Sequence, residues 1–344
     1  MGGGATVAVT IKDVSAKCGL SISTVSKAFN NYADISAETR ELVHRTAREI
    51  GYYPNAIART LKTNRSYNLG VLFQEERGTG LTHSFFASVL DAFKSEAEKH
   101  GYDITFINHN IGWTGMTYLE HCRYRNVDGA VVVCADFTRS EVRELAQSGF
   151  PCVTIDHEYP GCSCVLNDNF SGMEMLVRRA AELGHERIAL VYGHPSAVTS
   201  TRCEAYRAVM AQLGLAVPDA YQVQALYSFP NATYEAVHRL MKLPSPPTCI
   251  LLPDDHTSLG ALGALAELGL QVPRDVSICG YDGIMLTQML KPRLTTIQQD
   301  TWRAGTEAAN LLIDLIESPD PLPPRRVVVP GKLLEGESIA PPKA

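Results

Sequence analysis

Short apolar segments alternate with amphipathic helical segments along most of this 344-residue chain. One series begins at residues 69–73 and a second begins at residues 187–192, and each runs for about 120 residues. This alternation is typical of parallel strands, because a parallel pair needs a long crossover connection and a helix usually supplies it. The sequence therefore predicts an α/β body with two doubly wound lobes. Ligands of such sheets bind at the carboxyl ends of the strands, which favours a binding cleft between the lobes.

The first 53 residues lack this alternation and predict short helices instead. Thr10 and Asp13 form a capping pattern for one helix, which Gly19 ends. Ser21 is the candidate cap of a second helix that reaches residue 29. Two short helices joined by a tight turn are the helix-turn-helix pattern, and a third helix is expected from Ser36. The predicted fold class is thus a small all-α helix-turn-helix head followed by the α/β body.

Charge is divided unevenly between these two parts. The whole chain has a net charge of -6, which taken alone argues against DNA binding. Residues 1–67, however, contain nine lysines and arginines against five acidic residues, so this segment carries +4 and the remainder carries -10. A basic head on an acidic body restricts any DNA contact to the head and the segment that follows it.

Several classes of protein are disfavoured by what the sequence lacks. No run approaches 18 apolar residues, and the N-terminus resembles no secretory leader, so we expect a cytoplasmic protein with no membrane partner. The nine cysteines form no C-x-x-C pair, and the ten histidines show no metal spacing. Nucleophile-elbow, phosphate-loop, zinc-protease and dinucleotide motifs are absent. We therefore expect no catalytic residues, no metal and no cofactor.

The head closely resembles the DNA-binding domain of the lactose/galactose repressor (LacI/GalR) family of bacterial transcription regulators. The resemblance is carried without a gap by residues 10–27 (TIKDVSAKCGLSISTVSK), 35–40 (ISAETR), 50–55 (IGYYPN) and 58–61 (ARTL). It implies that Ile22, Ser23 and Lys27 read base edges in the major groove. Lys27 departs mildly from the arginine that is common there, and it could instead contact a phosphate or stay solvated.

The resemblance also implies a hinge helix after the head, over residues 56–61. Such a short helix needs a partner for stability, and the family pairs it with its dimer mate on DNA. Leu61 would then wedge into the minor groove, although it could instead pack on the body. The full set of expected DNA-binding residues is Ser21, Ile22, Ser23, Thr24, Lys27, Asn30, Tyr52, Asn55, Ala58, Arg59 and Leu61.

The body resembles the same family and, through it, the periplasmic-binding-protein-like fold. The matching stretches include residues 69–72 (LGVL), 183–189 (LGHERIA), 273–282 (PRDVSICGYD) and 294–300 (LTTIQQD). We assign residues 8–53 to the helix-turn-helix domain and 54–67 to the hinge helix and linker. Residues 68–165 with 294–320 are assigned to the first lobe, and 166–291 with 325–341 to the second.

This resemblance also places a small-molecule effector between the lobes. The residues expected to bind it are Phe86, Asp156, Arg202, Tyr227, Phe229, Asp254, Asp255 and Asp282. Two alternatives stay open, because Asp255 could simply cap a helix and Phe86 could belong to the core. Asp254 stands where related regulators often have Asn, and a second carboxylate suits a hydroxyl-rich or cationic effector better than an anionic one.

Together these observations predict a DNA-binding transcription regulator, most simply a repressor, that acts as a homodimer on a near-palindromic operator. Its operator affinity would respond to a sugar or sugar derivative bound between the lobes. The alternative is a sugar-binding receptor of the transport type without a role on DNA, since that class shares the body fold. The intact head counts against this alternative.

Overall fold

The structure is a computed structural model that describes residues 9–30, 32–53, 65–74, 80–111 and 114–343. It divides into two units, Met1–Ser66 and Tyr67–Ala344. The first unit is the helical head, and the second unit is the α/β body with both lobes. Residues 54–64, which include the whole predicted hinge helix (residues 56–61), lie outside the described residues.

Three helices form the head: α1 (Ile11–Cys18), α2 (Ile22–Phe29) and α3 (Ala37–Ile50). The predicted capping box is confirmed, because the Thr10 amide and hydroxyl both donate to the Asp13 carboxylate at 2.8 Å. Gly19 ends α1 at a φ of 67°, a left-handed conformation that glycine adopts without strain. The helices enclose a small core of Val14, Val25, Ala28, Val43 and Ala47.

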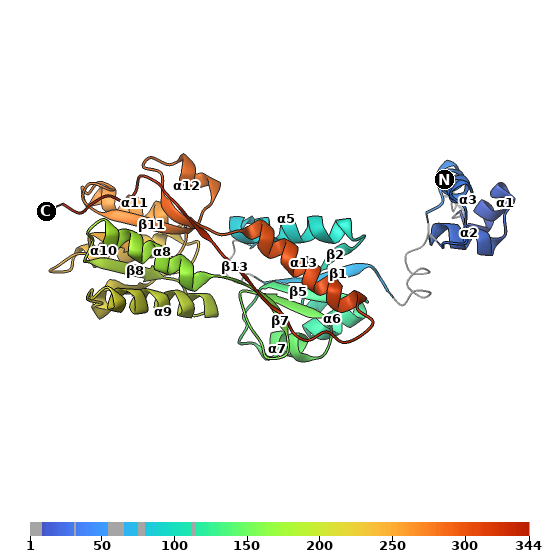
Figure 1. Cartoon of the computed structure of the whole chain (residues 1–344), viewed down its shortest axis with the longest axis horizontal. Coiled ribbons are helices and arrows are strands. Elements are labelled where there is room, and N and C mark those ends of the chain that lie inside the picture. Colours follow the sequence, from blue (N-terminus) through green and yellow to red (C-terminus); the bar gives the residue numbers. More distant parts are fainter. Residues whose placement is uncertain (1–8, 31, 54–64, 75–79, 112–113, 344) are drawn as a thin grey trace, which may run out of the picture. The chain divides into compact units, whose positions relative to one another are not determined.

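The first lobe contains a six-stranded parallel sheet in the order β13-β7-β6-β5-β1-β2. Helices α5 and α13 pack on one face of this sheet, and α6 and α7 pack on the other (Figure 1). A short helical turn, η1 (Gly80–Thr82), precedes α5, and β3 (Asn110–Ile111) pairs with β4 (Thr114–Gly115). The bounds of the main elements are β1 Asn68–Phe73, α5 Ser84–Lys99, β2 Asp103–Phe106, α6 Tyr118–Tyr124, β5 Gly129–Cys134, α7 Ser140–Gln147, β6 Cys152–Ile155, β7 Ser163–Asn167, α13 Thr301–Glu317 and β13 Arg326–Val329.

The second lobe contains a six-stranded sheet in the order β14-β12-β11-β10-β8-β9, in which only β14 pairs antiparallel. Helices α8 and α9 cover one face, and α10 and α11 cover the other. The bounds are α8 Asn169–Glu182, β8 Ile188–Tyr192, α9 Ala197–Gln212, η2 Asp219–Tyr221, β9 Gln222–Gln224, α10 Pro230–Met241, β10 Cys249–Leu251, α11 Ser258–Glu267, β11 Ser277–Asp282, α12 Met285–Met289, β12 Thr295–Gln298 and β14 Lys332–Leu334.

The structure corrects the predicted lobe boundaries near the C-terminus. Strand β12 belongs to the second lobe, where Ile297 pairs with Tyr281 and is buried in that core, although residues 294–320 were assigned to the first lobe. Strand β13 belongs to the first lobe, where Val327 pairs with Val165, although residues 325–341 were assigned to the second. The chain therefore crosses between the lobes three times, after β7, β12 and β13.

No helix within the described part of the chain is both long enough and apolar enough to cross a membrane.

Candidate functional site

The N-terminus of α2 presents two unused side chains at the surface of the head. Ile22 is 45% exposed, which is unusual for a large apolar side chain, and Ser23 beside it is also exposed. Ser21 and Thr24 are already engaged, because the Ser21 hydroxyl caps α2 by accepting from the Thr24 amide at 3.1 Å. The N-terminus of such a helix can enter a major groove of DNA, where residues 22 and 23 would be the first to meet the base edges.

The other predicted head residues have partners within the head. Lys27 forms an ion pair with Asp34 at 2.5 Å, and this hydrogen bond raises the pKa of Lys27 and lowers that of Asp34. Asn30 closes α2 by donating to the Ser26 carbonyl at 2.6 Å. The ring of Tyr52 packs against Phe29, with 5.6 Å between the centroids. Asn30 and Tyr52 thus stabilise the head, whatever they contact on DNA.

Four predicted DNA-binding residues lie outside the described residues: Asn55, Ala58, Arg59 and Leu61.

A cavity of about 520 Å³ lies between the two lobes of the body. Much of its wall comes from the carboxyl ends of the parallel strands and the segments that follow them: residues 133–138 at the end of β5, 155–157 at the end of β6, 194–198 after β8, and single residues at the ends of β10, β11 and β12. This is the position expected for a ligand of doubly wound sheets. Of the predicted effector residues, the cavity brings together Phe86, Asp156, Arg202, Tyr227, Asp254 and Asp282.

Arg202 is the only lysine or arginine among the described residues that line the cavity, and it is 6% exposed. Its Nε donates to Asn169 at 2.7 Å, and one terminal nitrogen donates to the Pro253 carbonyl at 2.8 Å. The guanidinium lies 3.4 Å from the centre of the Tyr281 ring, a cation–π contact. Among the described residues, Arg202 forms no ion pair, and its second terminal nitrogen has no hydrogen-bond partner. The protein thus holds Arg202 in place, and its guanidinium keeps N–H groups that can donate to a ligand.

Asp282 ends β11 and faces the cavity beside Arg202. Its φ of 116° is rare for a residue with a side chain, and such strain is common at functional sites. One carboxylate oxygen accepts from the Gln299 amide at 2.6 Å, which leaves the other for a ligand. Burial raises the pKa of Asp282 well above its ordinary value, although Arg202 opposes this rise.

Asp156 and Asp254 line the cavity, but each already has partners in the protein. Asp156 accepts from the backbone and side-chain amides of Asn167 at 2.9–3.0 Å. Asp254 accepts from the amides of Ser228 and Thr257 at 2.5 and 2.9 Å, and so fixes two loops of the second lobe. Burial raises the pKa of both carboxyls.

Two predicted effector residues do not line the cavity. Asp255 turns into the second lobe, where it accepts from Thr296 at 2.6 Å, Ile284 at 2.9 Å and Thr287 at 3.0 Å. Burial raises its pKa to about 6. Phe229 directly precedes α10 and lies outside the cavity lining. In the structure Asp255 is thus a structural carboxyl that ties β12 and the segment before α12 together.

Sequence reasoning missed several lining residues, among them Gln74, Phe137, His157, Ser196 and Gln299. Each lies within a few residues of the carboxyl end of a strand, and that position is the signal that could have found them. Phe137 and His157 stack face to face at 4.3 Å with an angle of 8° between their planes. Phe86 packs against His83 and Phe73 and also lies at the cavity wall, so it belongs to both the core and the cavity lining.

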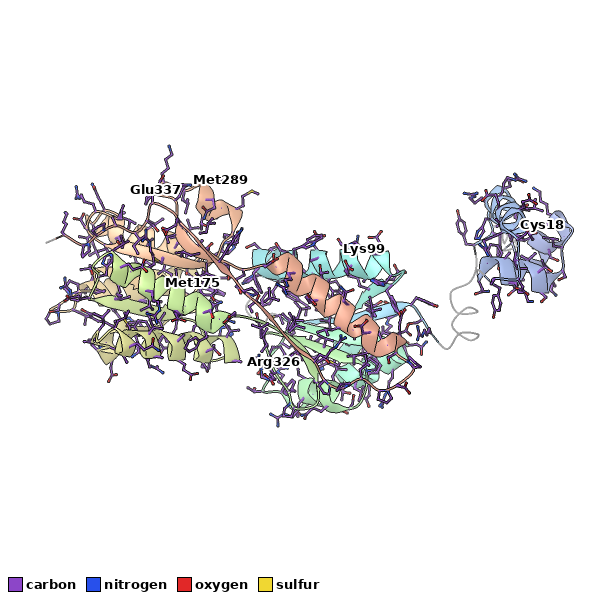
Figure 2. The ribbon with its side chains drawn as sticks, viewed as in Figure 1. Cys18, Lys99, Met175, Met289, Arg326 and Glu337 are labelled. Carbon is purple, nitrogen blue, oxygen red and sulfur yellow. The ribbon has the colours of Figure 1, made fainter. Side chains whose placement is uncertain are left out.

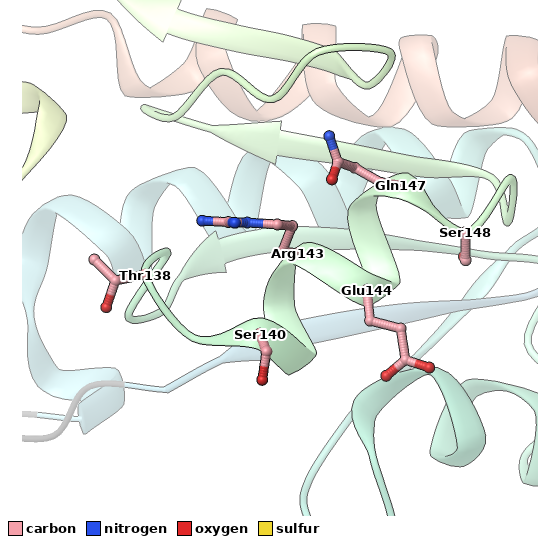
Figure 3. Close-up of a pocket in the computed structure, with 6 residues that line it drawn as sticks. All are labelled: Thr138, Ser140, Arg143, Glu144, Gln147 and Ser148. Carbon is pink, nitrogen blue, oxygen red and sulfur yellow. The ribbon is translucent and has the colours of Figure 1, made fainter.

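A second depression lies on the outer surface of the first lobe, along α7 (Figure 3). All six of its lining residues are exposed, and Arg143 and Glu144 project away from the helix into solvent. An open surface of this kind cannot enclose a small molecule, so the cleft between the lobes is the candidate effector site.

Comparison with known proteins agrees with this geometry. Residues 10–55 match the lacI family of bacterial regulatory proteins, and residues 177–339 match the periplasmic binding protein-like domain. The HTH-type transcriptional repressor PurR of Haemophilus influenzae is 30% identical over 315 residues, which is 90% of this chain and 92% of that protein. PurR of Escherichia coli is 30% identical over 340 residues, which is 96% and 97% of the two chains.

Solved structures share the whole architecture. The transcriptional regulator CelR in complex with cellobiose is 25% identical with a TM-score of 0.69, and the match covers 96% of this chain and 99% of that one. The Lac repressor dimer bound to operator and the anti-inducer ONPF has a TM-score of 0.81 over 97% and 99% of the chains; at 24% identity it shows the fold alone. The chain belongs to the LacI/GalR family of bacterial regulatory proteins and is a DNA-binding transcription regulator.

Proposed function

We propose that the protein is a homodimeric repressor whose operator affinity is set by a neutral, hydroxyl-rich small molecule bound between the lobes. The head supplies the contact with DNA through the exposed start of α2, where Ile22 and Ser23 are free to meet base edges. The relatives at 30% identity are transcriptional repressors, which supports repression rather than activation.

The observation that carries the effector proposal is the pairing of Arg202 with Asp282 in the cavity. Arg202 keeps unused N–H donors, and Asp282 keeps a carboxylate oxygen that can accept. Two neighbouring hydroxyls of a sugar satisfy both, because one accepts from the guanidinium while the other donates to the carboxylate. Relatives of known structure carry cellobiose in CelR and ribose in a regulator from Enterococcus faecium, both at 25% identity.

The charge of the cavity argues against an anionic effector. Four aspartates line it: Asp136, Asp156, Asp254 and Asp282, against Arg202 as the single basic side chain of fixed charge among the described lining residues. A phosphate or carboxylate there would meet one guanidinium, and each of the four aspartates would repel it in its ionised form. A neutral ligand avoids this repulsion.

An exposed apolar patch supports the dimer. Met285 and Met289 of α12 are 74% and 72% exposed, and Leu286 between them is 43% exposed. Figure 2 shows Met289 projecting from the outer surface of the second lobe. Three large apolar side chains exposed on one short helix suit contact with a second copy of the chain. As a regulator of transcription, the protein would act in the cytoplasm and bind its small molecule without converting it.

The test uses the full chain and a pool of random DNA duplexes. We expect selection of a near-palindromic site, with binding that falls steeply as salt increases, because phosphate contacts release counterions. Addition of the cognate sugar from a panel should change that affinity. The variant Arg202→Gln should bind the same DNA but lose the response to sugar. Absence of salt-sensitive DNA binding in both the presence and absence of sugars would disprove the proposed function.

A further inference from the structure

Two cysteines lie side by side on neighbouring strands of the first lobe. Cys152 begins β6 and Cys162 directly precedes β7, and these parallel strands pair Val153 with Ser163. One step back in the same register sets Cys152 beside Cys162, and the Cys162 thiol donates to the Cys152 carbonyl at 3.4 Å. Neighbouring strands lie about 4.7–4.9 Å apart, and the Cα atoms of a disulfide are usually separated by roughly 4.4–6.8 Å. The backbone therefore already has the spacing that a disulfide needs.

The two thiols differ in reactivity. In its ionised form, Cys162 accepts a hydrogen bond from the Cys152 thiol, which lowers the pKa of Cys162 and raises that of Cys152. Burial raises the pKa of Cys152 further. A lowered pKa favours the thiolate, which is the nucleophile in thiol oxidation. Cys162 is 6% exposed and Cys152 is 4% exposed, so a small oxidant can reach the pair whereas a bulky one is excluded.

We infer that Cys152 and Cys162 are a redox pair, which hydrogen peroxide converts to a disulfide that restrains the cleft wall between them. The Cys162 thiolate attacks the O–O bond of the peroxide; a sulfenic acid forms, and the hydroxide released takes up the thiol proton to become water. The Cys152 thiol then attacks the sulfenic sulfur. The S–S bond forms, the S–O bond breaks, and the oxygen leaves with the Cys152 proton as a second water. Two thiols are oxidised, one peroxide molecule is reduced, and a thiol reductant reverses the change.

The disulfide would link both ends of a segment that forms part of the cleft wall. Asp156 and His157 lie between the two cysteines and line the cavity between the lobes. The same segment carries Tyr159, whose hydroxyl donates to the Phe137 carbonyl at 2.5 Å. Linking the ends closes the short loop of residues 152–162 and removes conformational freedom from it. The oxidation state of the pair is therefore coupled to the cleft, whichever molecule the cleft binds.

A second cysteine pair provides an internal comparison. The thiol of Cys249 on β10 is in hydrogen-bond contact with the thiol of Cys279 on β11, the neighbouring strand of the second lobe. Both of these side chains are 0% exposed, so the fold itself keeps peroxide away from them. We expect this pair to stay reduced under conditions that link Cys152 to Cys162.

Peptide mapping of the full chain after treatment with hydrogen peroxide tests the inference. Free thiols are alkylated, and the chain is then cut with chymotrypsin. Cleavage after Tyr159 leaves Cys152 and Cys162 on different peptides unless a disulfide joins them. We expect a joined peptide whose mass is lower by two hydrogens than the sum of its parts, and dithiothreitol added before alkylation should abolish it. Cys249 and Cys279 should both be alkylated.

Variants separate the roles of the two thiols. Cys152→Ala should stop the reaction at a sulfenic acid on Cys162, which dimedone traps. Cys162→Ala should give no dimedone adduct on Cys152, because that thiol stays protonated. A general loss of packing would label both variants, so this asymmetry distinguishes reactivity from a folding defect. Cys164→Ala is the matched control, because it removes a neighbouring thiol on β7 and should leave the link intact.

Hydrogen–deuterium exchange measures the restraint on the cleft wall. Amides in residues 153–161 should exchange at least about twofold more slowly in the oxidised wild type, and peroxide should not slow them in Cys152→Ala. Two results would overturn the inference. If peroxide forms no disulfide, or only disulfides that involve Cys122 or Cys164, then Cys152 and Cys162 are not a redox pair. If the link forms but exchange is unchanged, the disulfide does not restrain the cleft wall.

Discussion

Burial sets the ionisation of the carboxyl groups around the cleft. Asp156, Asp254, Asp255 and Asp282 all have a raised pKa, with burial as the largest cause in each case. Their roles differ nevertheless, because Asp282 keeps an oxygen for a ligand whereas Asp255 is fully engaged by the protein. A raised pKa at a cleft is thus not enough to assign a ligand contact, and the hydrogen-bond partners decide.

The pH dependence of stability should reveal the buried carboxyl of Asp255. Its folded-state pKa of about 6 lies above the unfolded value, so the folded protein holds the proton more tightly. The stability from this group is fully present below about pH 4 and is lost as pH rises through about 6. Asp255→Asn removes this dependence, and urea unfolding at several pH values should show the wild type losing up to about 3 kcal/mol relative to the variant.

An exposed carboxyl provides the control for this experiment. Asp320→Asn should leave the pH profile of the wild type unchanged, because Asp320 is exposed. Asp255→Asn should still bind the effector, since Asp255 does not line the cavity. Parallel pH profiles for the wild type and Asp255→Asn would contradict the assignment.

On the head, Asp34 should restrain DNA binding through its ion pair with Lys27. Asp34 is 54% exposed and Lys27 is 39% exposed, so solvent screens the pair and its attraction is weak. Asp34→Asn frees Lys27 for DNA, and we expect operator binding up to about fivefold tighter in an electrophoretic or anisotropy titration. Glu38→Gln is the matched control, because it changes net charge equally at an exposed site on α3. An equal gain in both variants would mean that only net charge matters.

At the scale of elements, local patterns predicted most of the secondary structure. The capping residues Thr10, Ser21 and Ser36 begin helices as predicted, and the apolar runs at residues 69–73 and 130–134 are strands shifted by at most one residue. These signals depend on neighbours along the chain, so a sequence displays them directly.

These local patterns do not predict which strands pair with one another. Strands β12 and β13 are both short and rich in β-branched residues, and nothing local tells which sheet each joins. Their assignment depends on pairing with β11 and β7 more than 10 residues away, which is a property of the folded lobes. The same limit applies to the site, because Asp254 and Asp255 are adjacent in sequence but only one of them reaches the cavity.

Close packing of α13 on α5 should make Gly305 indispensable to the first lobe. A Cβ at Gly305 would lie 2.3 Å from the Val89 carbonyl oxygen, so the two helices would have to separate. We expect Gly305→Ala to destabilise the protein by about 1–3 kcal/mol in urea unfolding, which is the usual effect of overpacking. Gly263→Ala on α11 is the control, because its Cβ would meet only the Tyr234 ring at 3.8 Å. Gly263→Ala should leave the free energy of unfolding unchanged or raise it, since alanine favours helix more than glycine does. An equal loss of stability in both variants would contradict the packing argument.

At the scale of the whole body, an effector acts by favouring one arrangement of the lobes over another. It can shift the equilibrium only by its difference in affinity for the two arrangements. The cavity between the lobes is lined by residues of both lobes, so a closed arrangement is the one that can surround a ligand. Beyond the three chain crossings, a direct contact links the lobes: the Ser84 hydroxyl at the start of α5 lies 2.9 Å from Nε2 of His256 in the second lobe.

Loss of this contact should open the cleft. A hydrogen bond contributes about 0.5–1.5 kcal/mol, so Ser84→Ala should reduce the closed population and weaken effector binding about two- to tenfold. Small-angle X-ray scattering of the ligand-free protein should show a larger radius of gyration, and a saturating effector should restore the wild-type value. Ser88→Ala, one turn along the same exposed face of α5, removes a hydroxyl that bonds only within its own helix and should change neither measurement. If Ser84→Ala changes neither the radius of gyration nor the effector affinity, the hydrogen bond does not help to close the cleft. The three chain segments that cross between the lobes, together with the ligand, would then determine how far the cleft closes.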